Sequence, residues 1–129
     1  MMLKKTAYAL PAFITAGIIF YFSSLENIAL PLEAVSFNDL LFHAAAYFFF
    51  GLTLILAAYP WNASLNYPLR VYLILGTIGT LYGLSDEIHQ FFVLNRTCSI
   101  SDLFADSFGV IVALLGFRWW VKGYMRESG

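Results

Sequence analysis

Charged residues, cysteines and basic patches are all scarce in this sequence. Charged residues make up 12% of the 129 positions and hydrophobic residues 60%. A soluble globular domain carries about 25% charged residues, so this composition excludes an ordinary soluble domain. The single cysteine, Cys98, excludes an intramolecular disulfide and a cysteine-based metal site. The net charge of −1 gives no argument for binding nucleic acid, which requires a basic face, and we expect no nucleic-acid partner.

What the sequence does contain is long apolar runs. Four of them approach or exceed the roughly 20 residues that a helix needs to cross the hydrocarbon core of a bilayer. They cover residues 6–25, 40–59, 71–93 and 103–121, and the first holds no charged side chain. The sequence therefore predicts an all-α, polytopic membrane protein. We expect a single domain over residues 1–129, folded as a bundle of four transmembrane helices.

The few charged residues sort by sign when these runs are read as membrane spans. One side receives six of the basic residues, which are Lys4, Lys5, Arg70, Arg118, Lys122 and Arg126. The other side receives Arg96, both histidines and seven acidic residues, which are Glu26, Glu33, Asp39, Asp86, Glu87, Asp102 and Asp106. Because Lys and Arg are retained on the cytoplasmic side, this asymmetry predicts that both termini are cytoplasmic.

Helical periodicity places small and polar residues on shared faces, at about 100° per residue. One face of the third run holds Gly79, Tyr82, Gly83, Asp86, His89 and Gln90. Faces of the fourth and second runs hold, respectively, Asp102, Asp106, Gly109, Ala113 and Gly116, and Asp39, His43, Ala46, Tyr47 and Phe50. Small residues let membrane helices approach closely, so we expect these faces to meet. Their outer ends would then gather Asp39, His43, Asp86, Glu87, His89, Gln90, Arg96, Asp102 and Asp106.

This predicted cluster does not balance its own charge. Its five carboxylates face one permanent cation, Arg96, which leaves about −4 when both histidines are neutral. Ionisable groups within a membrane are costly unless they are paired. The sequence thus predicts compensation by retained protons, by charged histidines, by a bound metal ion or by the cationic part of a ligand.

Three segments of the cluster form a recognisable pattern. They are Asp39-Leu-Leu-Phe-His43-Ala-Ala-Ala-Tyr47, Asp86-Glu87-Ile-His89-Gln90 and Arg96-Thr-Cys-Ser99-Ile-Ser-Asp102-Leu-Phe-Ala-Asp106-Ser-Phe-Gly109. Together they resemble the VanZ-like family of small bacterial membrane proteins, which combines D-K-x-x-H-x-x-x-Y, D-E-x-x-Q and R-x-x-S-x-x-D-x-x-x-N-x-x-G. The resemblance covers about residues 38–116. Leu40 stands where the family usually has Lys, and Asp106 where it usually has Asn.

The resemblance implies a multi-pass protein of the bacterial cytoplasmic membrane. The family is named after a teicoplanin-resistance protein, which implies a link to envelope antibiotics, and it implies no settled reaction. We therefore expect membrane lipids as partners, with a lipid-linked cell-wall precursor or a glycopeptide-type antibiotic as candidate ligands. Four short spans form a minimal bundle, which leaves a homo-oligomer open.

Three hypotheses remain for the function of the cluster. In the first, which we favour, it binds an envelope ligand through Asp39, His43, Tyr47, His89, Gln90, Arg96, Ser99, Asp102 and Asp106. In the second, the protein is a hydrolase or transferase in which Asp86 and Glu87 act as acid and base. In the third, the cluster is a structural ion-pair network that clamps the third and fourth spans through Arg96. An ion pathway is disfavoured, because the inner halves of spans two to four hold no acid and no histidine.

Single residues carry further expectations. No cofactor is predicted, although His43, His89 and Glu87 have the side-chain types that bind zinc or manganese; no tight metal motif is present. We expect His43 to form a hydrogen bond with Asp39, one turn before it. Arg96 is expected to contact either an anionic group or Asp102. Asp102 is expected to cap the N-terminus of the fourth helix.

Overall fold

The computed structural model describes residues 5–25, 37–61 and 65–127. Over these residues the chain is entirely helical apart from turns. The long helices are α2 (Leu10–Ser24), α3 (Phe37–Ala58), α4 (Leu69–Phe91) and α5 (Ile100–Glu127), and two short 3-10 helices are η1 (Ala7–Ala9) and η2 (Tyr59–Trp61). This confirms the predicted all-α class with four long helices. The expected loop around Pro31 lies outside the described residues.

Three of the helical segments are long and apolar enough to cross a membrane. They are Ala7–Ser24, Asn38–Trp61 and Ile100–Glu127. Helix α4 is not among them, although its 23 residues would span about 34 Å. The polar residues Asp86, Glu87 and Gln90 near its end lower its apolar content, and all three are buried in the bundle. The fourth span and the cytoplasmic placement of both termini stay predictions.

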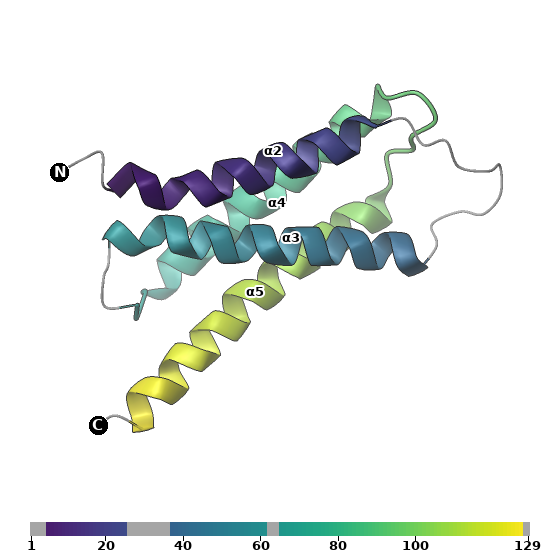
Figure 1. Cartoon of the computed structure of the whole chain (residues 1–129). Coiled ribbons are helices and arrows are strands. Elements are labelled where there is room, and N and C mark those ends of the chain that lie inside the picture. Colours follow the sequence, from purple (N-terminus) through teal and green to yellow (C-terminus); the bar gives the residue numbers. More distant parts are fainter. Residues whose placement is uncertain (1–4, 26–36, 62–64, 128–129) are drawn as a thin grey trace.

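Successive long helices run in opposite directions, as Figure 1 shows. Helices α2 and α3 lie side by side, α4 lies behind them, and α5 crosses α3 obliquely so that its last turns point away from the other helices. In consequence, the end of α2, the start of α3, the end of α4 and the start of α5 share one end of the molecule. Large apolar side chains cover the perimeter, with Phe13 74% and Phe42 75% exposed. Such a surface is suited to lipid rather than water.

Glycines set the closest helix contacts. A methyl group on Gly109 of α5 would collide with the carbonyl oxygen of Ala44 on α3, so these two backbones touch. Gly51 of α3 faces Val110 and Ala113 of α5 in the same way. On α4, a Cβ at Gly79 would lie 2.7 Å from a methyl group of Val110. The faces that carry small residues therefore do meet, as the sequence predicts.

One residue of the predicted packing face behaves differently. A Cβ at Gly116 would meet no atom of the described residues within 4 Å. The expectation that Gly116 packs together with Gly109 is therefore wrong. Helical phase places both on one face, but in the described part of the chain the neighbours of that face do not reach Gly116.

Candidate functional site

The predicted cluster forms at the shared end of the bundle. Asp39 and His43 lie in the first two turns of α3, and Asp102 and Asp106 in the first two turns of α5. The last turns of α4 contribute Asp86, Glu87, His89 and Gln90. Asp86, Glu87, Gln90, Asp102 and Asp106 are all buried, with at most 4% of each residue exposed. The arrangement brings polar groups of three helices together, as helical phase predicts.

The central contact joins His43 to Asp106. Nδ1 of the imidazole lies 2.9 Å from Oδ1 of the carboxylate, and their side chains are 12% and 0% exposed. His43 is thus paired with a residue of another helix; its expected hydrogen bond with Asp39 stays a prediction. Gly83 of α4 makes room for this pair, since a Cβ there would lie 3.1 Å from Cβ of Asp106 and 3.2 Å from its Oδ2.

Glu87 connects α4 to the start of α5. The backbone N–H of Ser99 donates a hydrogen bond of 2.8 Å to Oε2 of Glu87. Ser99 immediately precedes α5, where backbone N–H groups have no partner within the helix. Asp102 lies in the first turn of α5 and not at its N-cap, so the expected capping role is corrected. Its carboxylate still lies where the helix dipole favours negative charge.

Several buried oxygens of this cluster have no hydrogen-bond partner within the described residues. These atoms are Oε1 of Glu87, Oδ1 of Asp102 and Oδ2 of Asp106. An unsatisfied buried acceptor costs about 1–3 kcal/mol, and more when it is charged. Side-chain ligand atoms of His43, Glu87 and Asp106 all lie within 4.8 Å of one another, and so do those of Asp39, His43 and Asp102. The cluster is therefore compact and short of hydrogen-bond donors.

A cavity of about 520 Å³ adjoins the cluster between α2, α3 and α4. It is lined by Ile18, Ile19, Phe22, Ser23, Asp39, Phe42, His43, Ala46, Tyr47, Asp86, Gln90 and Arg96. Three of its polar atoms are buried without a partner in the described part of the chain, namely Oγ of Ser23, the hydroxyl of Tyr47 and Oδ1 of Asp86. The other oxygen of Asp86 accepts a hydrogen bond of 3.2 Å from Nε2 of Gln90. Apolar walls and a polar end thus share one space.

Arg96 holds the end of α2. Its guanidinium donates hydrogen bonds to the carbonyl oxygen of Phe22, at 2.7 Å, and to that of Leu25, at 3.1 Å. Carbonyl groups at a helix C-terminus lack partners within the helix and carry partial negative charge, so a cation is favourable there. In place of the expected contact with Asp102, the structure shows hydrogen bonds to backbone. Arg96 nevertheless lines the cavity.

His89 lies apart from the carboxylates. Its Nε2 is 2.9 Å from Oγ of Ser24, and its ring stacks on Phe20 with 4.5 Å between the centroids. Of the three residues whose side-chain types suit a metal, His89 is therefore held elsewhere. Ligand atoms of His43 and Glu87 lie close to one of Asp106 instead.

The contribution of α2 to the site was not predicted from the sequence. Ser23 lines the cavity, and the carbonyl oxygen of Ala16 accepts a hydrogen bond of 2.6 Å from the hydroxyl of Tyr82 on α4. The available signal was the pair Ser23-Ser24 at the end of an otherwise apolar run. Without a charge or a periodic pattern, this pair did not stand out.

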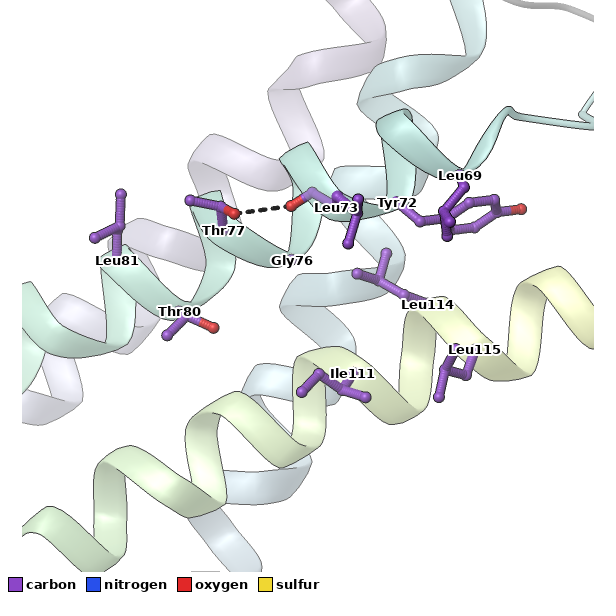
Figure 2. A pocket seen from close by; sticks show the side chains of 10 residues that line it. All are labelled: Leu69, Tyr72, Leu73, Gly76, Thr77, Thr80, Leu81, Ile111, Leu114 and Leu115. Atoms are coloured by element: carbon purple, nitrogen blue, oxygen red, sulfur yellow. Dashed lines mark hydrogen bonds between the residues drawn. The ribbon is translucent and has the colours of Figure 1, made fainter.

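A second cavity, of about 430 Å³, lies between α4 and α5 where α5 diverges (Figure 2). Leucines at positions 69, 73, 81, 114 and 115 and Ile111 form most of its wall. The hydroxyl of Thr77 points back to its own helix and donates a hydrogen bond of 2.9 Å to the carbonyl oxygen of Leu73. No charged side chain of the described residues lines this cavity, so they offer no chemistry there comparable to the polar cluster.

Comparisons with known proteins agree with the pattern of the cluster. The family model described as VanZ/LLP1 matches residues 4–121, which include all four long helices except the last turns of α5. No curated protein and no solved structure matches the chain. Because the family model extends over nearly the whole chain, the protein belongs to the VanZ/LLP1 family.

Proposed function

We propose that this protein binds an amphipathic molecule of the bacterial envelope in the cavity between α2, α3 and α4. The polar head of the ligand would lie against Ser23, Tyr47 and Asp86, and its apolar part would lie along Ile18, Phe22 and Phe42. Candidate ligands are an envelope lipid, a lipid-linked cell-wall precursor and a glycopeptide-type antibiotic. Each of these combines hydroxyl or amine groups with apolar surface.

The observation that carries the proposal is the set of buried polar atoms facing the cavity. Oγ of Ser23, the hydroxyl of Tyr47 and Oδ1 of Asp86 lack a partner within the described residues, and all three residues line the same space. Buried polar groups are nearly always hydrogen-bonded in folded proteins. A ligand with an amine or hydroxyl group would satisfy the carboxylate of Asp86 and both hydroxyls at once.

The cavity walls favour a ligand with an apolar part. Ile18, Phe22 and Phe42 line the cavity and are themselves 51%, 59% and 75% exposed. Side chains that line the cavity and are also exposed at the surface form its rim. The cavity therefore opens along the apolar flank of the bundle. In a bilayer, this flank meets lipid tails, and an acyl chain can enter without first crossing water.

Arg96 would add a second point of recognition. A guanidinium has five N–H donors in total, and the structure uses two of its nitrogens for the carbonyl groups of Phe22 and Leu25. Donors remain for a phosphate oxygen, which Arg binds well. A zwitterionic head group would therefore place its ammonium at Asp86 and its phosphate at Arg96.

The alternative of a hydrolase or transferase has less support from the geometry. Asp86 lines the cavity, whereas Glu87 turns to α5 and accepts the N–H of Ser99. An acid/base pair has to reach the same substrate atoms. Binding therefore remains the favoured function.

The experiment measures binding of a phosphatidylethanolamine that carries a fluorophore on its acyl chain to the full chain in detergent. We expect Asp86→Asn to weaken binding about tenfold or more, and Ser23→Ala and Tyr47→Phe about fivefold each, as lost hydrogen bonds of about 1 kcal/mol predict. Tyr21→Phe is the matched control, because Tyr21 is 61% exposed and does not line the cavity. Equal affinity of Asp86→Asn and the unchanged protein would refute the proposal. Hydrolysis of the lipid by the unchanged protein but not by Glu87→Gln would replace it with the enzymatic alternative.

A further inference from the structure

We propose that His43, Glu87 and Asp106 together bind one divalent transition-metal ion beside the ligand cavity. Each residue comes from a different helix, namely α3, α4 and α5. Such an ion would tie three helices together at the polar end of the bundle. The inference rests on the cluster itself and does not require the proposed lipid ligand.

The first support is the spacing of the donor atoms. One ligand atom from each of His43, Glu87 and Asp106 lies within 4.8 Å of the other two. Ligands of a tetrahedral ion with bonds of about 2.1 Å lie about 3.4 Å apart. Side-chain rotations that move the ligand atoms by about 1 Å would therefore bring them to the spacing that one ion requires.

The second support is independent of spacing. Glu87 is 1% exposed and Asp106 is 0% exposed, yet Oε1 of Glu87 and Oδ2 of Asp106 have no hydrogen-bond partner in the described part of the chain. A buried carboxylate with an idle oxygen is strongly unfavourable unless a cation compensates it. Oδ1 of Asp102 is a further buried acceptor without a partner, and its residue lies one turn before Asp106.

The known cation in this region does not meet that need. The guanidinium of Arg96 donates to backbone carbonyls of Phe22 and Leu25, not to this cluster. His43 supplies a hydrogen bond to Oδ1 of Asp106 and leaves Oδ2 of Asp106 idle. The surplus of carboxylates therefore persists after the hydrogen bonds of the described residues have been counted.

The donor set selects the class of metal. One imidazole nitrogen with carboxylate oxygens suits Zn²⁺ or Mn²⁺, whereas Ca²⁺ and Mg²⁺ take oxygen ligands alone. Thiolate ligation is not involved, since Cys98 is exposed and the described donor groups do not include it. Metal ligands usually have a carboxylate or carbonyl partner that fixes their orientation. The N–H of Ser99 plays the corresponding part for Glu87, because it holds one carboxylate oxygen and leaves the other free.

The experiment uses the full chain purified in detergent with a tag that contains no histidine. The protein is stripped with a chelator, and Zn²⁺, Mn²⁺, Ca²⁺ and Mg²⁺ are added in separate arms. We expect about one equivalent of Zn²⁺ or Mn²⁺ to be retained, measured by elemental analysis, and a higher melting temperature in those arms. Glu87→Gln and His43→Gln should each weaken metal binding by more than about tenfold. Glu87→Gln keeps an acceptor for the N–H of Ser99, and Asp106→Asn is a second variant that keeps the volume of the side chain.

Matched controls separate this site from adventitious binding. His89→Gln removes a histidine from α4 that contacts Ser24 and Phe20 instead of the cluster, and Cys98→Ser removes the only thiol. Both controls should retain the metal of the unchanged protein. Less than a tenth of an equivalent of either ion in the unchanged protein would overturn the proposal, and so would equal metal content in Glu87→Gln. Because no lipid is added, these results do not depend on whether the cavity binds one.

Discussion

His43 on α3 and Asp106 on α5 form a direct contact across 63 positions of sequence, with Nδ1 of the imidazole 2.9 Å from Oδ1 of the carboxylate. The pair lies next to the crossing of α3 and α5, where Gly109 touches the backbone of Ala44. Close approach of the two backbones is what allows two short side chains to reach each other. The packing of small residues and the chemistry of the cluster are thus two consequences of one helix crossing.

The first prediction concerns this pair. We expect His43→Phe to lower the free energy of unfolding by about 3–5 kcal/mol, because it leaves the fully buried carboxylate of Asp106 without its hydrogen-bond partner. Asp106→Asn should cost about 1 kcal/mol or less, since an amide oxygen still accepts from His43 and carries no charge. The measurement is an SDS titration in mixed micelles with chelator present, so that metal loss does not contribute.

The two variants change the same contact from opposite sides, and the order of their effects is the test. If Asp106→Asn proved as costly as His43→Phe, the negative charge of Asp106 would itself be stabilising. A protonated His43 would then be the first candidate for the partner of that charge. The only other histidine of the chain is His89, so His89→Phe, which disturbs a contact with Ser24, provides the comparison.

Much of this end of the molecule could be predicted from sequence. The long apolar runs predict the helices. The acidic residues lie near those ends of the runs that face the same side, which predicts that their side chains converge. Helical phase also predicts the meeting of Gly79 and Gly83 with residues of α5, which the structure confirms. These predictions depend only on the geometry of single helices and on the cost of burying charge.

The partners of individual side chains could not be predicted in the same way. On α4, Glu87, Asp86 and His89 span an arc of roughly 160° at 100° per residue. In the structure this arc extends from Ser99 at the start of α5, which Glu87 contacts, across the cavity at Asp86, to α2, which His89 contacts. The sequence pattern places Asp86 and His89 on one face and gathers Glu87 with them only at the outer end, but an arc of that width meets three different surroundings. The positions of those neighbours are set by the tertiary fold.

The second prediction uses the two glycines of α5 that share a face. Gly109→Ala should destabilise the protein by about 3 kcal/mol, because its Cβ meets backbone atoms of α3 that cannot yield as a side chain would. Gly116→Ala should be neutral or stabilise by up to about 1 kcal/mol, since Ala favours a helix and the space there is open. Unfolding by SDS titration measures both values.

These two substitutions are chemically identical and lie seven residues apart, so the difference between them shows whether α5 is closely packed at Gly109 and open at Gly116. Similar losses at both positions would mean that Gly116 packs in the membrane against a neighbour that the described residues do not supply. A second copy of the chain would then be the first partner to examine by crosslinking. A loss confined to Gly109 agrees with the divergence of α5 seen in Figure 1.

The last prediction tests the orientation that the charge asymmetry implies. Cys98 is the only cysteine, is exposed, and lies in the connection between α4 and α5 at the acidic end. We expect a membrane-impermeant maleimide to label it in intact cells, because that end should face outward. Partial desolvation and the carboxylates of Glu87 and Asp102 raise the pKa of the Cys98 thiol, so less thiolate is present at a given pH than for a free cysteine. Labelling should therefore become faster as the pH rises from 7 to 8.5.

The control is Gly123→Cys combined with Cys98→Ser, which places the thiol at the opposite end of α5 and should react only after the membrane is permeabilised. Labelling of this control in intact cells, with Cys98 protected, would reverse the proposed topology and place the carboxylate cluster on the cytoplasmic side.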